Sequence, residues 1–494
     1  MALNTVTTQN DATLKQGKLG TLSVAFMIIA ASAPLTVLAG GTPTNYAVSG
    51  LLGVPLSFLS FGVIVGLFAV GYGRMSAHVR NSGAFYEYVS QGLGLRQGIA
   101  AAILALVAYN LMQIGLFGIF GFSASAALAA ITGVSVPWWV TGGVAWLLIG
   151  LLGVSNIDAS AKLLGILVTL EFIVVAGVSV FGFITAPEGV STAPLAPSEF
   201  AAPGIGVLLV FTMAAFMGFE SGAIYSEEAR DPERTISRAT YIAVFTVALF
   251  YAGSAWAMAV GIGPSQVIEK AQMYGPDLVF VWIAEYSPLL ANTIHVLFTT
   301  SILAALLAFH NAAARYFFSL GRSGVLPQKF STTASTGAPV VGSITQSALS
   351  LLVVAGFALA GKGSELGELY PVLTLFTWLT NAAGFGIVFL MTITSLAIMR
   401  WAIKNHPEFG LFVKVIAPAL AAVGLAVVTM LILMNFDIMI GDTGPSWLVW
   451  LMPGVILGSG VLGLIWGEVL IRKGRVAVSS EEGPNYQPIA APTV

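Results

Sequence analysis

Long apolar stretches dominate this chain and restrict the folds that are open to it. Twelve of them run for roughly 20 residues or more, the length that an α-helix needs to cross about 30 Å of hydrocarbon. Composition agrees, because 57% hydrophobic and 9% charged residues leave too little polar surface for a soluble domain. We therefore expect an all-α polytopic membrane protein with transmembrane helices at residues 21–47, 53–77, 97–131, 137–156, 158–186, 204–229, 236–263, 289–321, 338–360, 369–401, 410–435 and 446–471.

Positively charged residues predict how these helices are oriented. If both ends of the chain are cytoplasmic, 18 of the 20 Lys and Arg residues fall on the cytoplasmic side, and two, Lys270 and Lys362, fall outside. Membrane proteins show this bias towards cytoplasmic positive charge. We expect cytosolic tails at residues 1–18 and 474–494. The first apolar run has no small-residue cleavage pattern at its end, so we expect it to be retained as a membrane span.

The composition also excludes several kinds of chemistry. The chain has no cysteine, and its four histidines lack the spacing of metal ligands. We expect no metal, no cofactor and no nucleic-acid partner. No connection is long enough for a soluble domain, so the protein must act in or across the lipid bilayer. A channel would need a polar stripe or a filter sequence, and a membrane-embedded enzyme would need clustered reactive side chains; the sequence shows neither.

Two of the predicted spans are interrupted near their centres. In the sixth, Gly218 weakens the helix, and Glu220 places a costly carboxylate in hydrocarbon. In the first, Pro34 removes a backbone donor and clashes with the preceding turn, although a simple proline kink is the alternative. The two breaks correspond if spans 1–5 and 6–10 are halves of opposite topology. Broken helices at corresponding positions are typical of inverted-repeat transporters, which bind solutes at the exposed backbone groups.

Three motifs carry a resemblance to a known family. They are NSGAFYEY at 81–88, FMGFE at 216–220 followed by EE at 227–228 and DPERTISRA at 231–239, and RYFFSLGRSGVLP at 315–327. Through these motifs, over about residues 20–400, the chain resembles the bacterial amino acid permeases of the amino acid, polyamine and organocation superfamily.

The resemblance implies a fold and an activity. The fold would be a LeuT-like 5+5 inverted-repeat core at residues 19–190 and 191–405, with two peripheral helices at 406–473. The protein would be a secondary active transporter of the bacterial plasma membrane, working by alternating access as a monomer or a homodimer. We expect uptake of amino acids by symport; substrate exchange, or import of a polyamine or another organic cation, is the alternative.

The resemblance also implies where a substrate binds. Its carboxylate would meet the backbone of the first break at Ser32, Ala33, Leu35 and Thr36. Its amino group would meet the carbonyls of Ile29, Ala214 and Met217 near Gly218. The candidate pocket walls, for which ordinary helix packing is the alternative, are Tyr109, Asn110, Phe216 and Phe219. The family's usual Gly-Ser-Gly break is Ala-Ser-Ala-Pro here, so a carboxylate could be held differently or be absent from the substrate. Ala214 replaces the aromatic lid of arginine and agmatine exchangers, which disfavours that substrate class.

Two intramembrane carboxylates are candidates for coupling and gating. Glu171 lies near the middle of the fifth span. The resemblance implies that this position corresponds to one that a lysine occupies in several members of the family. Apolar surroundings favour the neutral form of a carboxyl group, so Glu171 is a candidate proton carrier. The alternatives are a sodium site completed by Thr300 and Ser301, or a structural carboxyl group. Glu220 is a candidate gate or helix-linking residue, with recognition of a cationic substrate or proton carriage as the alternatives.

Basic residues near the cytosolic end of the eighth span have two interpretations. They are a topology signal, or they form salt bridges that open with an inner gate. The basic cluster comprises Arg315, Arg322 and Lys329, and its candidate acidic partners are Glu227, Glu228 and Glu87.

Overall fold

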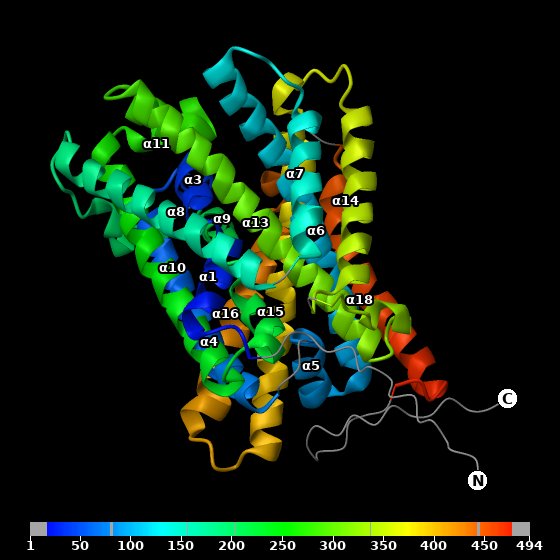
Figure 1. Ribbon diagram of the computed structural model, residues 1–494. Helices are drawn as coiled ribbons and strands as arrows, with labels where there is room; N and C mark the ends of the chain where they lie inside the picture. Colours follow the sequence, from blue (N-terminus) through cyan, green and yellow to red (C-terminus); the bar gives the residue numbers. More distant parts are fainter. Residues whose placement is uncertain are drawn as a thin grey trace, which may run out of the picture.

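The chain is built from helices (Figure 1). The computed structural model describes residues 17–79, 83–155, 157–202, 204–335, 337–441 and 445–476, and these residues form no β-strand. Eleven of the helical segments described are long and apolar enough to cross a membrane. They are Thr21–Ser49, Val54–His78 (α4), Leu95–Thr132 (α6), Ala161–Thr185 (within α8, Ile157–Thr185), Ile205–Glu228, Pro232–Ile262 (α10), Pro288–Arg322 (α13), Val340–Ala360 (α14), Gly367–Asn405 (ending in α15, Thr377–Asn405), Phe412–Met434 (ending in α16, Ala417–Met434) and Leu448–Arg472 (α18).

The remaining predicted span is the shorter helix α7, Trp138–Gly153, which packs against α6 and α14. Its 16 residues rise about 24 Å, less than the roughly 30 Å of a typical hydrocarbon core. The all-helical polytopic class is confirmed. The count of twelve spans, the inverted repeat and the repeat boundaries stay predictions.

Several helices run further than the apolar pattern predicted. α10 begins at Pro232 instead of residue 236, and α15 ends at Asn405 instead of residue 401. Hydropathy marks the part of a helix that suits lipid, whereas backbone hydrogen bonding continues into water. Proline at the first turn also suits a helix start, because its missing N–H would have no partner there.

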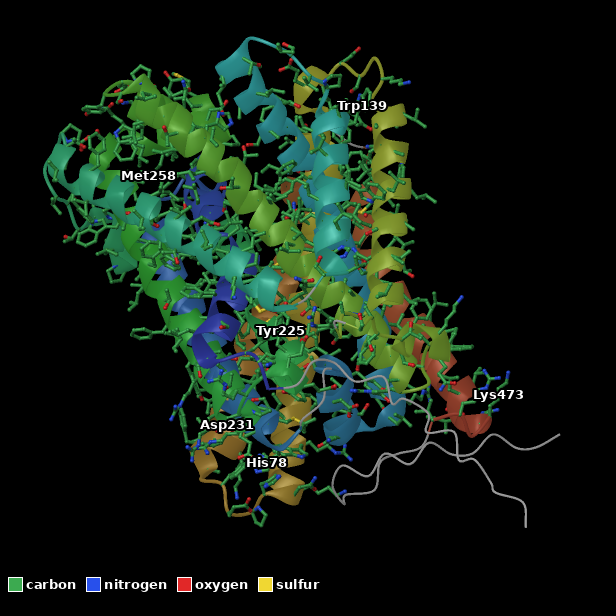
Figure 2. The ribbon with its side chains drawn as sticks, in the orientation of Figure 1. His78, Trp139, Tyr225, Asp231, Met258 and Lys473 are labelled. Carbon is green, nitrogen blue, oxygen red and sulfur yellow. The ribbon has the colours of Figure 1, made fainter. Side chains whose placement is uncertain are left out.

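Short helices mark the two ends of the bundle. Figure 1 shows α5, Phe85–Leu93, at one end and α11, Val267–Tyr274, at the other. Figure 2 places His78, Asp231 and Lys473 towards the first end and Trp139 towards the second. We call these the α5 end and the α11 end. Most of both predicted tails, residues 1–16 and 477–494, lies outside the residues described.

Two of the membrane-crossing segments are broken at the predicted places. The first broken helix consists of α1 (Thr21–Ser32), α2 (Pro34–Thr36), the π-helical turn η1 (Val37–Gly41) and α3 (Thr42–Ser49). The second consists of α9 (Ile205–Ala214), a turn at 215–218 and the 3₁₀-helix η4 (Phe219–Glu228). Both contact α13, which is buried along most of its length.

Candidate functional site

The first break has a backbone through which a helix cannot continue. α1 ends at Ser32, Ala33 adopts a left-handed conformation with φ of 49°, and Pro34 starts the next helical turn. Because Pro34 has no N–H, the carbonyl of Ala30 loses its usual helical donor. The N–H of Leu35 does not continue the ladder of α1 and donates instead to a side chain from α8.

That side chain is Glu171. Its Oε2 accepts the N–H of Leu35 at 3.2 Å and the hydroxyl of Ser301, from α13, at 2.6 Å. Ser301 Oγ also lies 3.1 Å from Thr36 Oγ1. Glu171 is 1% exposed, and its Oε1 has no hydrogen-bond partner among the residues described. None of the Lys, Arg or His side chains described forms an ion pair with Glu171.

Of the two hydroxyl residues predicted beside Glu171, the structure places only Ser301 in this network. Thr300 Oγ1 donates instead to the carbonyl of Leu297 in its own helix, at 2.8 Å. Successive residues of an α-helix point about 100° apart, so neighbours cannot both face α8. Thr36, predicted as a backbone contact of the substrate, joins the network through its side chain.

Tyr251 from α10 supports the other side of the first break. Its hydroxyl lies 2.8 Å from Ser32 Oγ, which also donates to the carbonyl of Ile29 at 2.9 Å. The same carbonyl accepts the N–H of Ala33 at 3.1 Å. The Ile29 carbonyl, predicted to receive the substrate's amino group, therefore already has two donors.

At the second break the backbone turns at Gly218, and the side chain of Glu220 stabilises this turn through hydrogen bonds. Gly218 has φ of 96°, a conformation that glycine adopts without steric cost. Glu220 is fully buried; its Oε2 accepts the N–H of Gly218 at 3.0 Å, and its Oε1 accepts the hydroxyl of Tyr109, from α6, at 2.8 Å. The hydroxyl of Tyr72, from α4, donates to the backbone carbonyl of Glu220. These contacts join the turn at Gly218 to α6 and α4, and the gating or helix-linking role of Glu220 stays a prediction.

The two breaks touch each other inside the bundle. A Cβ atom on Gly218 would collide with the Cβ atom of Ala31 at the end of α1. A glutamate carboxylate caps each break. Glu171 and Glu220 each accept a backbone N–H that has no helical acceptor because the helix is broken there. The carbonyl of Ala214 is engaged as well, by the N–H of Met217 at 3.3 Å.

The aromatic residues predicted as pocket walls face α4. The ring centroid of Phe216 lies 5.1 Å from that of Phe61, and that of Phe219 lies 5.7 Å from that of Phe68. Beside them is a cavity of about 10 Å³, room for roughly one water molecule. Only apolar side chains line it: Phe61, Met213, Phe216, Met217, Phe219, Ile387, Val388 and Met391. No amino acid fits this space, so these residues pack as a closed core in the conformation described.

Tyr109 and Asn110 differ in their surroundings although they are neighbours on α6. Tyr109 reaches the second break, and its ring centroid lies 5.4 Å from that of Tyr316. Asn110 donates to the carbonyl of Leu106 at 2.7 Å, while its Oδ1 is buried without a described partner. The roles of both residues in substrate binding stay predictions.

Two ion pairs join η4 to α13 near the α5 end. The guanidinium of Arg315 donates to both carboxylate oxygens of Glu228, at 2.7 and 2.9 Å, and both side chains are buried. Arg322 pairs with Glu227 in the same bidentate way at a more exposed position. Lys329, the third basic residue of the cluster, lies over the ring of Phe330. The salt bridges that the sequence offered as an alternative are therefore present.

Sequence reasoning missed two tyrosines that support the breaks, Tyr72 and Tyr251. A tyrosine within an apolar run carries no local signal of the residue its hydroxyl will meet. Tyr251 and Ser32 are 219 positions apart, and Tyr72 and Glu220 are 148 apart. Only the tertiary arrangement of α4 and α10 against the breaks identifies them.

Comparisons with known proteins show which proteins the chain is similar to in sequence. The chain is 23% identical over 374 residues to the gamma-aminobutyric acid permease of Bacillus subtilis (strain 168), and this alignment covers 72% of this chain and 74% of that protein. It is 23% identical over 361 residues to the lysine-specific permease LysP of Lactococcus lactis subsp. cremoris, covering 68% of this chain and 66% of the relative. It is 28% identical over 205 residues to the putrescine transporter PotE of Haemophilus influenzae, covering 41% and 44%.

The family model described as amino acid permease matches residues 23–477, which include both breaks, Glu171, Glu220 and the two ion pairs. The match covers most of the chain, and the relatives named above are transporters. The chain is therefore a multi-pass membrane transporter of small molecules and not an enzyme, and it belongs to the amino acid permease family.

Proposed function

We propose that the protein moves amino acids across the bacterial plasma membrane by alternating access, and that Glu171 couples uptake to a proton gradient. One observation carries this proposal: Glu171 accepts the backbone N–H of Leu35 at the first break. A titratable side chain is thereby in direct contact with the backbone that a substrate would need.

The surroundings of Glu171 suit a carboxyl group that gains and loses a proton. Oε2 accepts two hydrogen bonds, whereas Oε1 is buried without a described partner and is free to carry the proton. An ionised carboxylate here, with no described cation beside it, would cost several kcal/mol. Loss of the proton therefore favours a conformation in which water reaches Glu171. Such a difference between conformations is what allows an ion gradient to drive a conformational change.

Glu171 and a substrate carboxylate compete for the same donor. The N–H of Leu35 opens a helical segment, and such N–H groups attract carboxylates. A substrate carboxylate can reach this donor only after Glu171 releases it. A protonated carboxyl group is a weaker hydrogen-bond acceptor than a carboxylate, so protonation eases the release. Proton and amino acid then bind together, which is the requirement for symport.

A polyamine importer is the second candidate function. The unpartnered, buried Oε1 of Glu171 also suits a protonated amine. One of the relatives is named as a putrescine transporter, and that match covers 41% of this chain. A carboxylate-free amine would leave the bond between Glu171 and Leu35 in place. The two candidates therefore differ in whether the substrate displaces Glu171.

We assign the α5 end to the cytosol, with both chain termini on that side. Lys270 lies in α11 and Lys362 follows α14, and these two are the only Lys or Arg residues that our assignment leaves outside. The ion pairs Arg315–Glu228 and Arg322–Glu227 then close a cytosolic gate between η4 and α13. Release of substrate to the cytosol requires η4 to part from α13.

Uptake into proteoliposomes tests the coupling. Labelled alanine, γ-aminobutyrate, lysine and putrescine are offered with and without an imposed proton gradient. For one charge moved per substrate at 100 mV, about 2.3 kcal/mol supports roughly fiftyfold accumulation. Glu171→Gln keeps an acceptor for Leu35 and Ser301 but cannot ionise, so its substrate should only equilibrate across the membrane. If this variant still concentrates substrate as the parent does, Glu171 is not the proton carrier.

Neighbouring hydroxyl residues provide a matched control. Ser301→Ala removes a hydrogen bond to Glu171, whereas Thr300→Ala removes a hydroxyl that bonds only within its own helix. We expect the pH dependence of uptake to shift in Ser301→Ala and to stay unchanged in Thr300→Ala. Equal effects of the two substitutions would contradict the assignment of this network.

A further inference from the structure

The residues just before α1 are bound to the end of the second broken helix. The N–H groups of Lys18 and Leu19 both donate to the carbonyl of Glu228, each at 3.0 Å. The N–H of Arg230 donates back to the carbonyl of Leu19 at 2.8 Å. Leu19 and Ala229 thereby form the one isolated parallel β-bridge in the described part of the chain. This contact joins two segments that are 210 positions apart.

The bonds satisfy a backbone that has just left a helix. η4 ends at Glu228, and Ala229 follows in an extended conformation with φ of −72° and ψ of 144°. Carbonyl and N–H groups beyond a helix end need partners outside the helix. The segment Lys18–Leu19 supplies them, and Leu19 itself is buried.

Glu228 is consequently held in two independent ways. Its carboxylate is fixed by the guanidinium of Arg315, and its carbonyl is fixed by the N–H groups of Lys18 and Leu19. The backbone bonds set the position of the residue, and this position lets the short carboxylate side chain reach both donor nitrogens of Arg315. Separation of η4 from α13 must therefore either break the backbone bonds or carry Lys18 and Leu19 along.

We propose that Lys18 and Leu19 form a backbone latch that holds the cytosolic gate closed by keeping Glu228 in register with Arg315. The latch rests on the proposed function only in that the α5 end must open for substrate release. It makes the segment preceding the first broken helix a control element of the gate. Loss of two hydrogen bonds of ordinary strength should lower the ratio of closed to open gate populations about tenfold.

Cysteine labelling tests the latch without any knowledge of the substrate. The chain contains no cysteine, so Ser226→Cys introduces a single reporter. Ser226 is 1% exposed, lies two residues before Glu228, and its hydroxyl has no described hydrogen-bond partner. A membrane-impermeant maleimide is applied to the cytosolic face of inverted vesicles, and the labelling rate reports how often the gate opens.

Paired substitutions separate the backbone bonds from the side chains. Lys18→Pro with Leu19→Pro removes both donors, whereas Lys18→Ala with Leu19→Ala keeps them. We expect labelling of Ser226→Cys to rise about tenfold with the proline pair and to stay near the parental rate with the alanine pair. Equal labelling in the parent and the proline variant overturns the latch, and so does an equal rise in both variants.

A second substitution covers failure of the proline pair to reach the membrane. Arg230→Pro removes the third bond from the opposite side of the bridge, and faster labelling is expected again. Lys362→Cys, near the α11 end, is made in matching variants without Ser226→Cys and is labelled from the outer face of right-side-out vesicles. It reports whether the rest of the fold is intact and should label equally in every variant. If labelling behaves as expected while no tested solute is transported, the latch stands and the proposed substrate class fails.

Discussion

The two ion pairs at the α5 end allow the energetic effect of burial to be measured within one gate. Arg315 and Glu228 are 3% and 1% exposed, whereas Arg322 and Glu227 are 30% and 14% exposed. Both pairs are bidentate and join η4 to α13, so they differ chiefly in contact with water. Glu228→Gln leaves a buried guanidinium without its counter-charge, which costs about 3–5 kcal/mol. Glu227→Gln leaves a cation that water can reach, and we expect about 1 kcal/mol or less.

Detergent-induced unfolding of the purified protein measures these costs. Each single substitution is compared with its charge-free double, Arg315→Met with Glu228→Gln or Arg322→Met with Glu227→Gln. The buried double should recover most of the stability lost in Glu228→Gln, because no uncompensated charge remains. For the exposed pair, the coupling energy from the double-mutant cycle should be about 1 kcal/mol or less, the usual range for ion pairs in contact with water. If Glu228→Gln and Glu227→Gln destabilise the protein equally, the reasoning from burial is refuted.

Two further predictions follow from the breaks and from α5. Gly218→Ala should lower the thermal unfolding midpoint, because a side chain at φ of 96° costs about 1–3 kcal/mol and would also collide with Ala31. Gly177 has open space around it, so Gly177→Ala is the control and should change the midpoint little. Burial, opposed by Arg322 and reinforced by Glu227, raises the pKa of Glu87 from 4.5 to about 7, so the folded protein keeps a proton there that the unfolded chain has lost. Stability should therefore fall as pH rises from about 5 to 8, and Glu87→Gln should flatten that fall in midpoints measured across the range; an unchanged slope would contradict the assignment.

The positions of both breaks could be predicted because their causes are local. Pro34 lacks an N–H and Gly218 tolerates positive φ, whatever surrounds them. The contact of Glu220 with the second break could be anticipated for the same reason, because its carboxylate accepts a backbone N–H only two residues away. The depth of Glu171 in its helix followed from counting residues, because a helix rises about 1.5 Å per residue.

The partners of those residues could not be predicted from the sequence. The bond between Glu171 and Leu35 joins residues 136 positions apart, and it depends on the rotation of α8 about its own axis. The same uncertainty in rotation separates Ser301 from Thr300. For Phe216 and Phe219 the sequence left packing and pocket open, and the structure shows contacts with α4. The bonds of Lys18 and Leu19 to Glu228 involve only backbone groups, so residue types gave no sign of them.

The winding of η4 has a mechanical consequence. Its ten residues are coiled as a 3₁₀-helix, although such runs rarely exceed about three or four residues. At about 2.0 Å per residue they extend roughly 20 Å, whereas an α-helix of the same residues would extend roughly 15 Å. If η4 rewound into an α-helix, the segment would therefore become about 5 Å shorter and also wider. Its backbone hydrogen bonds would still be made within the helix. A displacement of about 5 Å would be enough to break the hydrogen bonds of 2.7 and 2.9 Å that join Glu228 to Arg315.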